Sequence, residues 1–145
     1  MAATITTRIM EDGPKNTVLL ISGTEAAGST PGYQTVILPA QTQFVNQSTR
    51  QRCASFRVSK IEWDIQAEAQ YQVILEWDAT VPVPFYYMIG RANKDFDDFG
   101  GIYQQSGIAG TTGGIGILTA NPAATGPTYT WTLVLYLEKL GLNPA

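Results

Sequence analysis

Histidine is absent from the 145-residue chain, and cysteine occurs once, at Cys53. Without an imidazole, the chain cannot form a Ser-His-Asp or Cys-His nucleophilic system, an imidazole zinc site or the ordinary histidine pH switch. A single cysteine cannot form a disulfide within the chain, and Cys53 has no histidine to activate its thiolate. We therefore interpret Cys53, which stands beside Ala54 and near Phe56, as a small buried hydrophobic side chain.

Charge is also scarce, because only 14% of the residues are charged and nine basic residues stand against twelve acidic ones. The net charge of −3 argues against a partner such as nucleic acid or a membrane surface, which a basic excess would favour. A hydrophobic fraction of 44% excludes a disordered chain. The sequence shows no secretory segment and no apolar run of the roughly 18–20 residues that a membrane span needs. We expect a protein that is made in the cytoplasm.

What the chain does contain is hydrophobic alternation with period two, which is typical of β-strands. The clearest case is the C-terminal stretch, where one face carries Tyr129, Trp131, Leu133, Leu135 and Leu137. A second such strand is predicted at residues 69–77. Further strands are predicted at residues 5–10, 17–22, 34–38, 41–45, 84–89 and 114–119. Turn-rich segments are predicted at residues 12–14, 23–32, 93–101, 107–114 and 121–127.

The strand at residues 56–65 contains a change of parity. Phe56 and Val58 alternate with polar residues, and the alternation then continues on the other parity from Ile61 onward, which predicts a β-bulge at Ser59-Lys60. The tripeptide Glu-Trp-Asp occurs at residues 62–64 and again at residues 76–78. The short connection between the two strands predicts a hairpin with both tryptophans facing the core.

Fourteen glycines, eight prolines and seventeen threonines suit short strands joined by loops. The predicted fold is all-β, a single antiparallel β-sandwich domain over residues 1–145 and specifically a jelly roll, with residues 1–4 and 141–145 as terminal arms. Pro82 and Pro84 predict an edge strand, because proline cannot donate a hydrogen bond to a β-ladder.

Two groups of carboxylates are candidate sites. Asp95, Asp97 and Asp98 could bind a hard cation such as calcium, but they lack the spacing of an EF-hand loop. The alternative is a turn in which aspartates accept backbone N–H groups while Phe96 and Phe99 pin the loop to the core.

The second group consists of Glu62, Asp64, Glu76 and Asp78. In the hairpin interpretation these carboxylates share the face opposite the tryptophans, where a glycosidase could place an acid–base pair. The alternative is a solvated outer face with basic side chains nearby as counter-charges. We expect no catalytic residue, no cofactor and no metal.

Two further groups are candidate contacts with a partner protein. Arg50, Arg52 and Arg57 form the only basic cluster, and arginine is enriched at interfaces. Phe85, Tyr86 and Tyr87 place large side chains on both faces of one strand, so that one face would need cover from a second subunit. Asp95, Asp97 and Asp98 complete the set of predicted contact residues.

Several motifs in order along the chain carry a resemblance to a known class of proteins. They are Thr-Arg-Ile-Met-Glu-Asp-Gly at 7–13, Ser-Lys-Ile-Glu-Trp at 59–63, Trp-Asp-Ala-Thr at 77–80, Phe-Asp-Asp-Phe-Gly-Gly at 96–101 and the strand at 129–139. From about residue 4 to 140 the chain resembles small β-sandwich or jelly-roll virion proteins of tailed bacteriophages, some of which decorate or cement capsids. The resemblance implies a structural function, with neighbouring proteins as partners and no substrate.

We therefore expect a non-enzymatic capsid decoration or cement protein that stabilises the phage head lattice and is located in the virion. Its expected partners are further copies of itself, as a homotrimer, and the major capsid protein or other virion proteins, with no nucleic acid and no membrane. One alternative is a head-tail connector, tail or fibre accessory protein. Another is a carbohydrate-binding β-sandwich, which exposed rather than buried tryptophans would favour.

Overall fold

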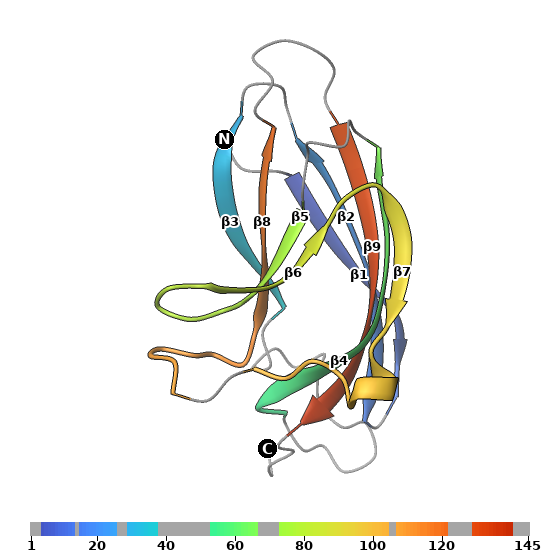
Figure 1. The fold of residues 1–145 in the computed structure, drawn as a ribbon, viewed down its shortest axis with the longest axis vertical. Coiled ribbons are helices and arrows are strands. Elements are labelled where there is room, and N and C mark those ends of the chain that lie inside the picture. Colours follow the sequence, from blue (N-terminus) through green and yellow to red (C-terminus); the bar gives the residue numbers. More distant parts are fainter. Residues whose placement is uncertain are drawn as a thin grey trace.

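The computed structural model describes residues 4–13, 15–25, 29–37, 53–66, 73–104, 107–121 and 129–140. These residues form two antiparallel sheets of five and four strands that pack as a β-sandwich (Figure 1). The five-stranded sheet contains β1 (Thr4–Asp12), β2 (Asn16–Glu25), β9 (Tyr129–Leu140), β4 (Ser55–Gln66) and β7 (Arg91–Asp95), in that order. The four-stranded sheet contains β3 (Ser29–Ile37), β8 (Ile115–Asn121), β5 (Val73–Trp77) and β6 (Val83–Met88), in that order. The predicted all-β sandwich is confirmed.

The eight strands from β2 to β9 pair in a nested manner. The outermost pair along the chain is β2 with β9, followed inward by β3 with β8, β4 with β7 and β5 with β6. Every pair is antiparallel, and successive pairs lie alternately in the two sheets. Strand β1 is outside this set and pairs with β2 at the edge of the five-stranded sheet.

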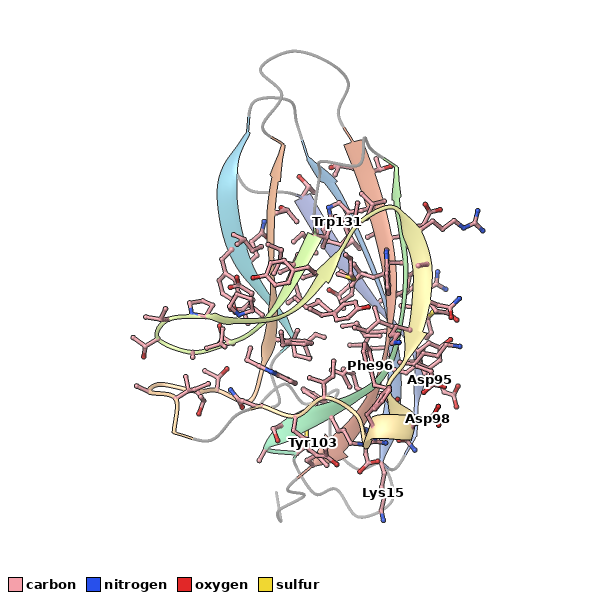
Figure 2. The ribbon with its side chains drawn as sticks, in the orientation of Figure 1. Lys15, Asp95, Phe96, Asp98, Tyr103 and Trp131 are labelled. Carbon is pink, nitrogen blue, oxygen red and sulfur yellow. The ribbon has the colours of Figure 1, made fainter. Side chains whose placement is uncertain are left out.

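The core lies between the sheets and is built from the inward faces that the alternation predicts. On β9 the buried residues are Trp131, Leu133, Leu135 and Leu137, all at most 1% exposed. Trp77 on β5 is also 1% exposed, whereas Trp63 on β4 is only half-buried. Figure 2 shows Trp131 between the two sheets. The predicted burial of the tryptophans is thus confirmed for Trp77 and Trp131, and Cys53 is buried as well.

The predicted bulge in β4 is confirmed, because the register with β9 shifts between Val58 and Lys60. The extra residue, Ser59, uses its hydroxyl to donate a hydrogen bond to the Tyr136 carbonyl at 3.0 Å. The shift lets Phe56, Val58 and Ile61 all point into the core.

The predicted hairpin between residues 56–65 and 69–77 is wrong. β4 pairs with β9 and β7 in one sheet, and β5 pairs with β6 and β8 in the other. The alternation identifies the face that a strand buries, but it does not identify the strand that lies beside it. The chain therefore crosses between the sheets where sequence proximity suggests a turn.

Three turn predictions also need correction. Residues 93–95 belong to β7, which the hydrophobic pattern misses because all five of its residues are exposed. β2 extends to Glu25 and β3 begins at Ser29, so much of the predicted turn at 23–32 is strand. β1 likewise extends to Asp12. The predicted strand at 41–45 and the start of the predicted strand at 69–77 lie outside the described residues.

The predicted edge position of Pro84 is confirmed, since β6 is the last strand of the four-stranded sheet. The only helix in the described part of the chain is a three-residue 3-10 turn, η2 (Asp97–Phe99). No helix among these residues is long and apolar enough to cross a membrane.

Candidate functional site

The structure brings two of the predicted contact groups together, because Arg57 and Asp97 form an ion pair. Arg57 Nη1 donates to Asp97 Oδ1 at 3.0 Å and to the Gly100 carbonyl at 3.1 Å. Arg57 Nη2 donates to Glu138 Oε2 at 3.2 Å. The side chain thereby joins β4 to β9 and to the η2 turn. Arg50 and Arg52, the other members of the predicted basic cluster, lie outside the described residues.

The guanidinium of Arg57 is largely engaged within the chain, since its side chain is only 16% exposed. Burial alone would lower the pKa of Arg57, but hydrogen bonds and charge attraction from Asp97 and Glu138 raise it overall. Gly101 has a positive φ of 84°, and a Cβ there would overlap the Arg57 side chain. Glycine at this position lets the loop close against the arginine.

The acidic loop is a turn of the kind that the sequence offers as the alternative to a calcium site. Asp95 Oδ1 accepts a hydrogen bond from the Asp97 backbone N–H at 2.9 Å. Phe96 is 8% exposed and lies on the inner side of the loop, whereas Asp95 and Asp98 lie on its outer side (Figure 2). Phe99, which was expected to pin the loop as well, is 77% exposed. No group of three or more cysteine, aspartate and glutamate side chains in the described part of the chain could hold a metal ion.

The four carboxylates of the two Glu-Trp-Asp tripeptides do not form one site. Glu62 and Asp64 lie on the outer face of β4, while Glu76 lies on β5 in the other sheet and Asp78 directly follows it. The shared face that the glycosidase hypothesis requires therefore does not exist. Glu62 forms an ion pair with Lys60 at 3.1 Å, as the solvated-face alternative predicts. Hydrogen bonding to Glu62 is the main cause that raises the pKa of Lys60.

An open depression of about 480 Å³ lies on the outer face of the five-stranded sheet, over β4, β7 and β9. Its lining includes Glu62, Asp64, Arg91, Asn93 and Thr132. These side chains offer both hydrogen-bond donors and acceptors. The alternation pattern does not reveal this surface, because β7 is exposed throughout and has no hydrophobic pattern, so β4 has no predicted neighbour on that side.

Asp78 is the centre of a hydrogen-bond network that the sequence did not reveal. Its Oδ1 accepts from the Tyr33 hydroxyl at 2.6 Å and from the Thr35 hydroxyl at 2.9 Å. Its Oδ2 accepts from the Thr112 hydroxyl at 2.7 Å. The network joins β3, the end of β5 and the glycine-rich segment before β8 (residues 110–114). Only the fold brings these residues together, since 34 to 45 positions separate them from Asp78 along the chain.

The electrostatics of this network give two neighbouring carboxyls opposite pKa shifts. Burial raises the pKa of Asp78, but the hydrogen bonds from Thr112, Tyr33 and Thr35 more than offset it and hold the pKa below its ordinary value. Glu76 is 5% exposed, and burial raises its pKa. Burial and the hydrogen bond to Asp78 also raise the pKa of the Tyr33 hydroxyl. Asp78 thus favours its charged form, while Glu76 disfavours it.

The aromatic segment of β6 is mostly used inside the sandwich. Phe85 stacks on Trp77 with ring centroids 4.3 Å apart. Tyr86 makes edge contacts with Trp63 and Phe96 at 5.5 and 5.3 Å. Burial raises the pKa of the Tyr86 hydroxyl.

A register shift between β5 and β6 lets both Phe85 and Tyr86 pack against the core, although they are adjacent in the chain. Tyr87 is 56% exposed and is the only one of the three predicted aromatic contacts that stays open to a partner. The aromatic face that was expected to need cover from a second subunit is therefore reduced to Tyr87.

Comparisons with models of protein families, with curated proteins and with solved structures found no match to this chain. The class that the structure defines is a two-sheet antiparallel β-sandwich. No family and no relative identifies it as a bacteriophage protein.

Proposed function

We propose that this chain is a non-enzymatic structural protein of a virus particle, which binds and stabilises the capsid lattice of a tailed bacteriophage as a homo-oligomer. The observation that carries the proposal is the nested pairing of the eight strands from β2 to β9. We interpret this pairing as the connectivity of a jelly roll, a fold that occurs in viral capsid and lectin domains. A fold supports a class of functions, and the resemblance to virion proteins selects among them.

The use of the charged side chains supports a structural function. Arg57 fixes the η2 turn to the five-stranded sheet, and Asp78 fixes the glycine-rich segment to the four-stranded sheet. Both groups thus hold loops in place, and a loop that is fixed before binding loses less entropy when it meets a partner.

The η2 turn is the best candidate for contact with a shell. Phe99 is 77% exposed at its end, with Asp98 beside it and the Lys94 ammonium 6.0 Å from the centre of its ring. An exposed aromatic side chain with a charged rim is a common anchor in protein interfaces. Arg57 hydrogen-bonds to Asp97 and Gly100, and so keeps this turn and Phe99 in a fixed position.

A decoration protein of this kind would act through many weak contacts. An oligomer that binds a symmetric lattice at several points gains avidity without a strong single contact. Because it binds only the assembled shell, it shifts the equilibrium toward the assembled state.

The burial of the tryptophans argues against the carbohydrate-binding alternative. Trp77 and Trp131 are 1% exposed and offer no face on which a sugar could stack. Trp63 is half-buried, and its indole N–H donates to the Ile89 carbonyl at 3.1 Å.

The test is to mix the chain with expanded empty capsids of a phage that carries it, and to compare their heat and osmotic stability with those of untreated capsids. We expect binding and greater stability. Phe99→Ala should weaken binding about tenfold or more, as loss of an aromatic anchor commonly does. Val81→Ala is the matched control and should leave binding unchanged. Val81 is 74% exposed in the β5–β6 loop, which projects from the side of the sandwich opposite the η2 turn in Figure 1.

Other outcomes would reject or change the proposal. Retention on tails but not on shells would move the assignment to a connector, tail or fibre protein. Retention on polysaccharide alone would contradict both virion assignments.

A further inference from the structure

Strand β1 lies outside the nested set of eight strands and forms an edge of the five-stranded sheet. It pairs with β2 on one side, and no strand of the described residues pairs with its other side. The facing sheet has only four strands, and Ile5 and Ile9 on the inward face of β1 are only half-buried. Within the described part of the chain, β1 thus has one edge without a strand partner, next to partly covered apolar side chains.

The position of β1 is fixed by polar contacts at its turn into β2. Lys139, which is 3% exposed, donates from Nζ to the Gly13 carbonyl at 2.9 Å. The Lys139 backbone N–H donates to the Lys15 carbonyl at 2.6 Å. The buried Thr17 hydroxyl donates to the Glu11 carbonyl at 3.1 Å. The free edge of β1 is therefore held in place before any partner arrives.

The other three edge strands carry features that discourage pairing with a further strand. β7 has only five residues, all exposed, of which three are charged. β6 contains Pro84 and a register shift, and β3 has register shifts on both sides of residues 32–35. β1 also has a register shift, but only after Ile9; from Thr4 to Ile9 its register is unbroken, and this part has no proline or glycine and only one charge, Arg8. Its free edge is the one that best fits a further strand.

We propose that β1 pairs in antiparallel fashion with β1 of a second copy of this chain, about a twofold axis at Thr7. This register places Ile5 of each copy opposite Ile9 of the other, and so covers both half-buried side chains. A register centred on Arg8 would place like charges opposite each other, which is unfavourable. A register centred on Thr6 would place Ile5 opposite Thr7, and Ile9 opposite residue 3, which precedes the strand, so neither isoleucine would meet the other.

The contact joins the two five-stranded sheets into one continuous sheet of ten strands. Pairs with twofold symmetry are the commonest oligomers, because one surface serves both subunits. The inference specifies the contact within the proposed homo-oligomer, and it makes this contact twofold rather than threefold. It does not depend on shell binding, so a monomer that binds shells would overturn this inference alone.

Cysteine cross-linking tests the register directly. In an antiparallel pair the Cα atoms of opposite residues are about 4.5–5.5 Å apart, which a disulfide can bridge. Thr7→Cys should therefore give a covalent dimer under mild oxidation. Thr4→Cys is the matched control, because both threonines are exposed on β1 but the two residues 4 would lie about 20 Å apart along the strands. Cys53 is buried and remains in both variants.

The mass of the unmodified chain gives the second measurement. Sedimentation equilibrium should show a dimer or an even multiple of it. Thr7→Lys places two ammonium groups face to face and should weaken the dimer at least about tenfold. Asn93→Lys adds the same charge to the exposed edge strand β7 and should leave the dimer intact. A monomer at every concentration, a trimer without the Thr7→Cys cross-link, or equal cross-linking of both cysteine variants would overturn the proposal.

Discussion

Replacing Asp78 by alanine tests whether the carboxylate network stabilises the sandwich. The change removes the acceptor of three hydroxyl groups at 2.6 to 2.9 Å. The Tyr33 hydroxyl is partly buried, and its bond should contribute about 1 kcal/mol. The bonds from Thr35 and Thr112 are exposed and should contribute about 0.5 kcal/mol each, because water can replace them. The expected loss is about 2 kcal/mol, or about 6 °C in Tm for a chain of this size.

The loss should depend on pH in one direction. The hydrogen bonds hold the pKa of Asp78 below its ordinary value of 3.8, so the folded state favours the carboxylate. Its contribution is fully present above the ordinary pKa and is lost as the pH falls through the lowered folded value. The difference between the original chain and Asp78→Ala should therefore be large at pH 7 and should shrink in strong acid.

Urea unfolding followed by tryptophan fluorescence, at pH 7 and at several acidic values, measures both effects. Asp98→Ala is the control, because Asp98 is exposed and its loss should change stability by less than about 0.5 kcal/mol. A loss below about 0.5 kcal/mol for Asp78→Ala at pH 7 would refute the reasoning. So would a difference that grows as the pH falls.

Three other substitutions test the packing and the charges. Gly23→Ala should cost about 1–3 kcal/mol in the free energy of unfolding, because a Cβ there overlaps the buried Trp131 ring. Gly13→Ala should cost less than about 0.5 kcal/mol, because the nearest described atom beyond the chain neighbours would lie 3.5 Å from its Cβ. Equal costs for the two variants would contradict this explanation. Glu76→Gln should raise the urea midpoint at pH 8 but not at pH 4. Burial raises the pKa of this carboxyl, so its charged form destabilises the fold only at higher pH. An effect that does not change with pH would argue against burial as the cause. Arg57→Ala should lower the free energy of unfolding by about 1 kcal/mol at low salt and by less at high salt, because its acidic partners are 58% and 36% exposed. If unfolding curves at the two salt concentrations give the same loss, packing alone is its cause.

The sequence by itself determined the fold class and much of the core. Alternation along β9 correctly identified the buried face, because side chains of a strand point to opposite sides at every step whatever its neighbours are. The change of parity at Ser59-Lys60 revealed the bulge for the same reason. The lack of histidine limited the available chemistry. These are local properties, which a single strand carries with it.

Only the tertiary structure decided which strands are neighbours. The predicted hairpin is wrong because β4 and β5 lie in different sheets. Each strand buries one face, and it can do so equally well in the same sheet as the other strand or in the facing sheet. β7 has no hydrophobic pattern because an exposed edge strand buries nothing. The Arg57–Glu138 pair spans 81 positions and the Tyr33–Asp78 bond spans 45. Contacts over such distances arise from the nested pairing of the strands, which no local pattern encodes.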